Sequence, residues 1–187
     1  MHDMTAVIVN LLQEDAQAAL PEALATGRPV VLAARDARVR APGAWMHLRA
    51  LLRHPLPITG VLGGRLDGPA ATLMLACDTL YMTPRASLRF EASGFGEVAL
   101  LALRLGHAKA SRVWFSGGEL SARLAVQAGW AEVGPTGFTA ALEADRTRYD
   151  KLSCEAITLL RPLLYHQAGL QLAQALAFIA ELFRVET

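Results

Sequence analysis

One stretch, residues 58–78, constrains the fold more than any other part of the sequence. It begins with a stretch that reads as a short buried strand, continues through a turn that contains Gly63, Gly64 and Gly68, and then becomes a helix of small residues. Glycines between a strand and a helix let backbone N–H groups approach a ligand closely, and the helix N-terminus adds partial positive charge. The stretch therefore predicts an α/β fold with a site for a phosphate, a carboxylate or an oxyanion.

The rest of the chain alternates strand and helix patterns, which indicates a single α/β domain. Strands are predicted at residues 5–11, 29–34, 58–62, 78–82, 87–90 and 130–133, and helices at 14–26 and 44–54 and through most of the chain after residue 96. The polar residues 35–40 are predicted to form a loop. We expect residues 1–135 to form the core, and residues 136–187 to form a helical segment that packs on the core or on neighbouring subunits.

Composition limits the partners that the chain can have. Of its 187 residues, 53% are hydrophobic and 19% are charged, and the formal net charge is +1. A nearly neutral chain has no bulk field to attract nucleic acid or an anionic membrane, and its apolar excess favours an oligomer. Neither a membrane-spanning apolar stretch nor a signal-peptide pattern is recognisable, so we expect a soluble, cytoplasmic protein.

The sequence shows no spacing typical of a metal site or of a nucleophilic serine. Cys77 and Cys154 lie far apart, and the five histidines include no pair at i and i+4. Cys77 lies in an apolar run and is expected to be a buried thiol. No serine lies in a G-x-S-x-G frame after a strand, so a hydrolase of that type is excluded, and no metal is expected.

Residues 58–78 resemble the central signature of the crotonase, or enoyl-CoA hydratase/isomerase, superfamily. Gly68 and the Ala-Cys-Asp sequence at 76–78 fall in register with that signature, and two further blocks, 30–45 and 105–130, resemble the family in order and spacing. The resemblance identifies the chain as a short and divergent member. It implies a ClpP/crotonase ββα spiral with a helical C-terminal oligomerisation segment, and a homo-oligomer that is a trimer or a hexamer.

The resemblance also implies an oxyanion hole. In the family, two backbone N–H groups polarise a thioester carbonyl and stabilise the enolate that forms. The first donor is placed at Gly43. The second falls on Pro69, which has no N–H, so the resemblance leaves Gly68 or Ala70 as the second donor.

The family's two catalytic glutamates are not retained, because their positions here are Thr72 and Gly94. Asp67 and Glu91 are the predicted acid–base residues, and Glu97 lies nearby in the sequence. Thr72 is predicted to position a water molecule, since a threonine hydroxyl is not a general base near neutral pH. The alternative for Asp67 is an ordinary solvent-exposed loop residue.

Arg35, Arg38 and Arg40 are predicted to contact the phosphates of coenzyme A, with an arginine-rich surface loop as the alternative. The implied function is a lyase or isomerase reaction on an acyl thioester, carried by coenzyme A or by an acyl carrier protein, with no other cofactor. The alternative is a catalytically lapsed relative that serves as a binding or scaffold subunit, beside an active paralogue. The sequence leaves open whether the chain is an enzyme.

Overall fold

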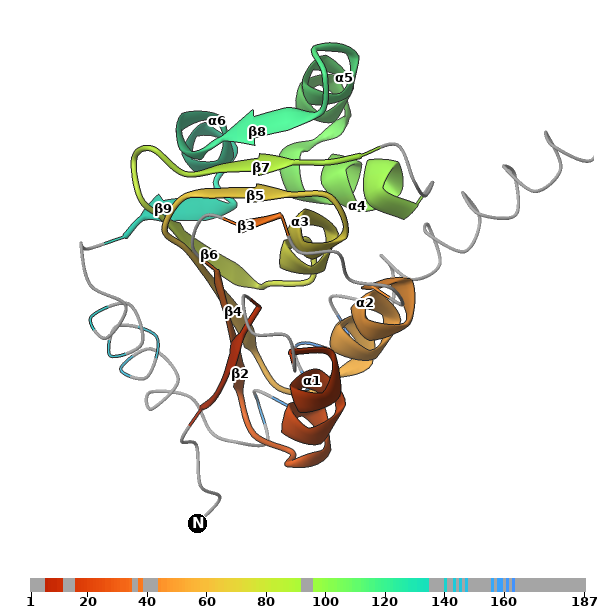
Figure 1. Cartoon of the computed structure of the whole chain (residues 1–187), viewed down its shortest axis with the longest axis vertical. Coiled ribbons are helices and arrows are strands. Elements are labelled where there is room, and N and C mark those ends of the chain that lie inside the picture. The colour runs from red at the N-terminus through yellow and green to blue at the C-terminus, as the bar shows by residue number, and fades with distance from the viewer. Residues whose placement is uncertain are drawn as a thin grey trace, which may run out of the picture.

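The computed structural model of the chain contains two β-sheets and the helices that pack against them (Figure 1). The structure describes residues 6–11, 16–34, 37–38, 44–91 and 96–134, together with nine single positions at 140, 143, 145, 147, 156, 158, 159, 161 and 163.

The first sheet has five parallel strands in the spatial order β1-β2-β4-β6-β9. Their bounds are β1 (Val7–Asn10), β2 (Val30–Ala34), β4 (Ile58–Leu62), β6 (Thr79–Met82) and β9 (Ala131–Val133). The second sheet has four strands in the order β3-β5-β7-β8, in which β3, β5 and β7 are parallel and β8 is antiparallel to β7. Their bounds are β3 (Ala37–Arg38), β5 (Arg65–Asp67), β7 (Ser87–Arg89) and β8 (Glu119–Ser121).

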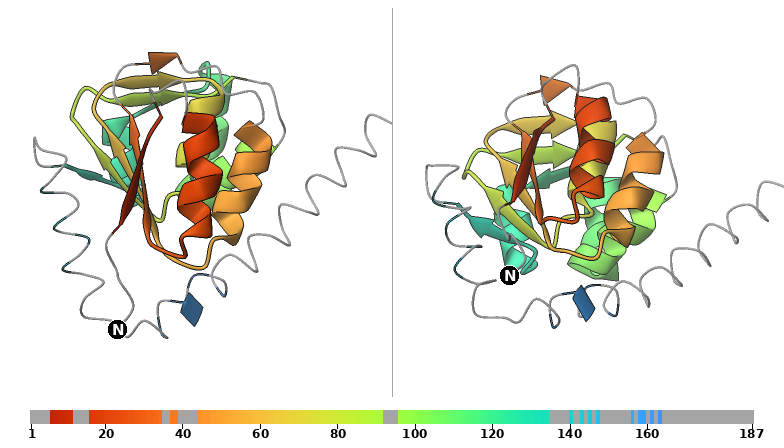
Figure 2. Two further views of the ribbon diagram at one scale, coloured as in Figure 1. Left: turned by 60° about the horizontal axis from the view of Figure 1, so that its bottom comes forward. Right: turned by 90° about the horizontal axis from the view of Figure 1, so that it is seen from below.

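The chain repeats one pattern: a strand of the first sheet, a strand of the second sheet, and a helix. The repeats are β2–β3–α2, β4–β5–α3 and β6–β7–α4, which form the ββα spiral that the sequence predicts. Figure 2 shows the second sheet across one end of the first, with α1 and α2 side by side on one face of the first sheet. The helices are α1 (Ala16–Ala25), α2 (Ala44–Arg53), α3 (Pro69–Met74), α4 (Gly96–Leu105), α5 (His107–Phe115) and α6 (Ala122–Gln127).

Close packing of β4 against β6 and against the residues around the end of α3 explains a glycine inside a central strand. A Cβ added at Gly60 would lie 2.7 Å from Leu80 Cδ1 and 2.8 Å from Cys77 Sγ, so any larger residue at this position would force buried side chains to move. Cys77 is buried, as predicted from its apolar surroundings, and burial raises the pKa of its thiol. Cys77 is therefore a core residue and not a reactive one.

The structure corrects the sequence prediction at three short strands. β3 lies within residues 35–40, which were predicted to be a loop, β5 follows Gly63 and Gly64 directly, and β8 follows Gly117 and Gly118. Each has only two or three residues, too few for the alternation of a strand to be recognisable. Pairing with neighbouring strands of the second sheet creates them.

Two buried residues of the C-terminal segment contact the core. The Asp145 carboxylate accepts hydrogen bonds from the Tyr81 hydroxyl, at 2.7 Å, and from the Thr59 hydroxyl. Arg161 donates through Nε to the Asp78 carboxylate at 2.7 Å. The described positions between 140 and 163 are helical, but the predicted role in oligomerisation stays a prediction. In the part of the chain that the structure describes, no helix is long and apolar enough to span a membrane.

Candidate active site

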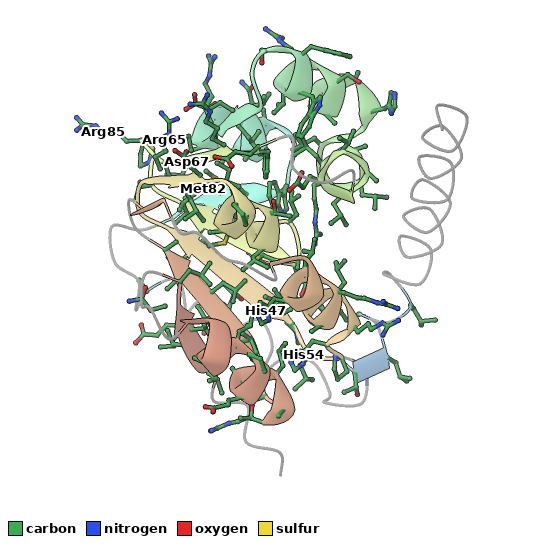
Figure 3. The ribbon with its side chains drawn as sticks, turned by 45° about the vertical axis from the view of Figure 1, so that its right-hand side comes forward. His47, His54, Arg65, Asp67, Met82 and Arg85 are labelled. Carbon is green, nitrogen blue, oxygen red and sulfur yellow. The ribbon has the colours of Figure 1, made fainter. Side chains whose placement is uncertain are left out.

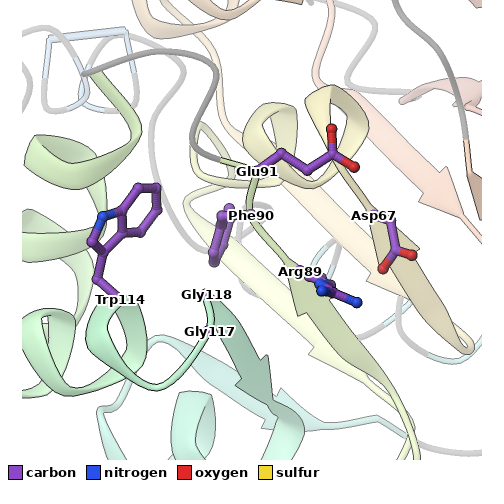
Figure 4. Close-up of a pocket in the computed structure, with 7 residues that line it drawn as sticks. All are labelled: Asp67, Arg89, Phe90, Glu91, Trp114, Gly117 and Gly118. Atoms are coloured by element: carbon purple, nitrogen blue, oxygen red, sulfur yellow. The ribbon is translucent and has the colours of Figure 1, made fainter.

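An open pocket of about 490 Å³ lies where β5 and β7 end, at one edge of the second sheet. Figure 4 shows the Phe90 ring between Trp114 of α5 on one side and the charged side chains of β5 and β7 on the other. The seven residues that line the pocket are Asp67, Arg89, Phe90, Glu91, Trp114, Gly117 and Gly118. Two of them, Asp67 and Glu91, are the carboxylates predicted for acid–base roles.

Gly68 joins β5 to α3 beside this pocket. Its φ of 65° lies in the left-handed region, where a side chain is disfavoured, and Pro69 then begins α3. A Cβ added at Gly68 would lie 3.3 Å from both Cδ and Oε2 of Glu91. The Glu91 carboxylate therefore packs directly against Gly68, so the structure brings together two site residues that lie 23 positions apart in the sequence.

Most of the backbone N–H groups of this turn donate hydrogen bonds to backbone carbonyl oxygens of the protein. The N–H of Gly68 donates to the carbonyl oxygen of Arg89 at 2.9 Å, and those of Ala71 and Thr72 donate to the carbonyl oxygen of Gly68. Ala70, in the first turn of α3, is 1% exposed. The hydrogen bond to Arg89 speaks against Gly68 as the second oxyanion donor and leaves Ala70 as the alternative. The first predicted donor, Gly43, lies outside the described residues.

Asp67 is held by an ion pair. Arg65 Nε lies 2.8 Å from Asp67 Oδ1, and this hydrogen bond raises the pKa of the Arg65 guanidinium (Figure 3). Asp67 is only 8% exposed, so the alternative of an ordinary exposed loop residue is wrong. Glu91 is exposed at the pocket, which makes it better placed than Asp67 to meet a ligand.

The Thr72 hydroxyl contacts a buried carboxylate in this structure. The hydroxyl donates to Glu97 Oε1 at 2.8 Å, and the two residues are 2% and 5% exposed. Neither is among the residues that line the pocket. The Thr72 hydroxyl therefore holds Glu97 in this structure, which leaves its predicted role in positioning a water molecule without support from the geometry.

The three arginines predicted to contact coenzyme A phosphates are only partly described. Arg38 is in β3, where it is the register partner of Asp67 on β5. Arg35 and Arg40 lie outside the described residues. Phosphate binding by these arginines stays a prediction.

The far wall of the pocket was not predicted. Trp114, Gly117 and Gly118 line it, and none of them was a candidate site residue. Gly118 has a φ of 74°, and a Cβ there would lie 2.6 Å from the carbonyl oxygen of Phe90. The Gly-Gly pair was the available signal, because adjacent glycines mark a close backbone approach. Among the described residues, no cluster of metal-ligating side chains occurs.

No protein-family model matches the sequence. No curated protein matches it either. Solved structures do: a monofunctional enoyl-CoA isomerase from M. smegmatis has a TM-score of 0.74 at 20% identity, with 88% of this chain and 89% of that chain covered. An enoyl-CoA hydratase/isomerase from Pseudoalteromonas atlantica has a TM-score of 0.67 at 21% identity, with 94% and 87% covered. OdaA from Pseudomonas aeruginosa has a TM-score of 0.73 at 21% identity, with 95% and 87% covered.

Proposed function

The chain has the crotonase fold that its sequence predicts, and we propose that it binds an acyl thioester in the pocket beside Gly68 and carries out acid–base chemistry on it. Similar structures are named as enzymes that act on enoyl-CoA. The thioester would be carried by coenzyme A or by an acyl carrier protein. The proposed reaction belongs to the lyase and isomerase classes, in which an enolate forms and is then protonated.

The observation that carries this proposal is the contact between Glu91 and Gly68. It places an exposed carboxylate at the start of α3, directly beside the pocket. There Glu91 would remove a proton from the carbon next to the thioester carbonyl, and the C–H electron pair would form the enolate. The same carboxyl group would then return the proton to that carbon or, where a 3-enoyl thioester gives a dienolate, to C4, which moves the double bond to C2–C3.

The aromatic residues of the pocket suit the acyl group of such a substrate. Phe90 and Trp114 supply apolar surface, while Glu91 and Arg89 supply charged groups from the same strand end. A pocket with apolar walls and a few polar groups is typical of small-molecule sites. Asp67, paired with Arg65, would contribute a negative charge at a fixed place beside the pocket and would not act as the base.

The proposal is tested with 3-butenoyl-CoA, whose C2 protons are acidic, and with the corresponding pantetheine thioester. We expect Glu91→Gln to lower turnover by about 10²–10⁴-fold while the protein still binds coenzyme A, because only the proton transfer is removed. The matched control is Glu119→Gln, an exposed glutamate on β8 in register with Arg89, which should leave turnover unchanged. If the wild-type protein neither turns over a thioester nor shows a coenzyme A-dependent thermal shift, the proposal is wrong.

A second candidate function is a binding or scaffold subunit that has lost catalysis. It is favoured by the glycine turn, where Pro69 lacks an N–H and the N–H of Gly68 is already bonded to Arg89. An oxyanion hole with one donor fewer would typically lose about 10²–10³ in rate. This alternative predicts a stable homo-oligomer, or a complex with an active paralogue, that shows no turnover.

A further inference from the structure

Glu97 is a buried carboxylate that the proposed reaction does not use. It lies in the first turn of the ten-residue helix α4, where the helix dipole favours a negative charge. Burying a carboxylate is costly unless hydrogen bonds compensate for the lost water, and the Thr72 hydroxyl on α3 supplies one at 2.8 Å. The contact therefore joins the start of α4 to α3.

The residues at the end of β7, which precede α4 in the chain, also contact the N-terminal end of α3. The N–H of Gly68 donates to the carbonyl oxygen of Arg89, and the Glu91 carboxylate packs on Gly68. Thr72 follows Gly68 by four residues, about one helix turn or ~6 Å along α3. Residues 89–91 thus contact Gly68, immediately before α3, and Glu97 contacts Thr72 within α3, about one turn further on.

This arrangement gives the Thr72–Glu97 contact a mechanical consequence for Glu91. Glu91 is exposed and is separated from Glu97 by only five residues, so the position of the start of α4 limits the positions that Glu91 can take. The backbone before Glu91 is already fixed, because the Phe90 N–H donates to the carbonyl oxygen of Gly118 at 2.9 Å. After Glu91, the hydrogen bond between Glu97 and Thr72 attaches the chain to α3.

We propose that Thr72 and Glu97 are positioning residues, whose hydrogen bond fixes the start of α4 on α3 and thereby holds the Glu91 carboxylate over Gly68. The proposal rests on the proposed role of Glu91 as the acid–base group. It gives Thr72 a role that the sequence did not indicate: Thr72 acts through Glu97 and does not contact the substrate.

The test compares Thr72→Val, which keeps the shape but removes the hydroxyl, with Thr72→Ser, which keeps the hydroxyl. We expect Thr72→Val to lower kcat about tenfold with little change in KM, and Thr72→Ser to restore wild-type turnover, because the hydroxyl alone makes the hydrogen bond. Hydrogen exchange measured by mass spectrometry should be about tenfold faster in the first half of α4 of Thr72→Val, with β2 and β4 unchanged.

Glu97 variants keep the proposal testable if Thr72→Val does not fold. Glu97→Gln retains an acceptor oxygen and should keep most of the turnover, whereas Glu97→Ala should behave like Thr72→Val. The double variant Thr72→Val/Glu97→Ala should lose no more than Glu97→Ala alone, since both changes remove one contact.

Hydrogen exchange separates failure of this inference from failure of the proposed function. Faster exchange in α4 of Thr72→Val, with no thioester turnover by the wild-type protein, would support the attachment of α4 but remove its proposed catalytic purpose. Wild-type exchange together with wild-type kcat in Thr72→Val would overturn the inference and leave the role of Glu91 intact.

Discussion

Arg161 donates through Nε to the Asp78 carboxylate at 2.7 Å, which joins the C-terminal segment to the last residue of the Ala-Cys-Asp sequence. Arg161 is 4% exposed and also donates to the carbonyl oxygens of Leu51 and His54, at the end of α2, and of Ala76. One guanidinium therefore satisfies acceptors from the ends of two helices and from a carboxylate. The Asp78 side chain has a structural role, as the partner of Arg161.

Removing this guanidinium should destabilise the whole protein. We expect Arg161→Met to lower the free energy of unfolding by about 3 kcal/mol, because it leaves a partly buried carboxylate and several carbonyl groups without their donor. Urea unfolding measures the change. The control is Arg85→Met at an exposed turn position, which should change the free energy by less than about 0.5 kcal/mol. Equal stability of the two variants would contradict this account of Arg161.

Gly118 should tolerate no side chain. In Gly118→Ala the new Cβ would lie 2.6 Å from the Phe90 carbonyl oxygen, on a backbone with a φ of 74°. The control is Gly129→Ala, where φ is 76° but no atom lies within 4 Å of the added Cβ. We expect Gly129→Ala to cost about 1 kcal/mol from backbone strain alone and Gly118→Ala to cost about 2 kcal/mol more. Similar unfolding midpoints for the two variants would show that the close approach to Phe90 is not needed.

His54 should make stability depend on pH. Burial lowers the pKa of His54 from its ordinary 6.5; the hydrogen bond to the Arg28 carbonyl opposes this shift, and the charge of Arg161 adds to it (Figure 3). Because the unfolded chain then takes up a proton more readily than the folded one, the free energy of unfolding should fall as the pH drops below about 6.5.

The pH dependence is measured by urea unfolding between about pH 5 and pH 7.5, a range that spans the ordinary histidine pKa. His54→Gln should flatten the dependence below pH 6.5, whatever its effect on absolute stability. His107→Gln, at an exposed position on α5, should leave the slope as in the wild type. A wild-type slope in His54→Gln would mean that another group titrates in this range.

The long elements of the fold were predictable because each carries its own pattern. β2 is a continuous apolar run, and α2 has Leu48 and Leu51 on one buried stripe, so the local sequence determines both elements. β3, β5 and β8 were missed because pairing with neighbouring strands creates them. The second sheet, which positions the pocket, therefore had little local signal.

The parts of the candidate site near a glycine or proline turn were predictable from the sequence. The parts that form where residues distant in the sequence meet were not. Gly68 was predicted from its turn, Asp67 from its place on that turn, and Glu91 from its place near the position of the family's second catalytic glutamate. The hydrogen bond between Thr72 and Glu97 joins residues 25 positions apart on two helices, so no spacing rule reveals it. Trp114 lines the pocket from α5, far in the sequence from Asp67, so no spacing rule reveals its place there either.

The most direct test of the proposed chemistry is deuterium incorporation into butyryl-CoA in D₂O, followed by NMR at the carbon next to the thioester carbonyl. We expect the wild-type protein to exchange these protons, Glu91→Gln to exchange them at least about 100-fold more slowly, and Glu119→Gln to match the wild type. Exchange at the wild-type rate by Glu91→Gln, or no exchange by the wild-type protein above the uncatalysed rate, would contradict the proposed chemistry.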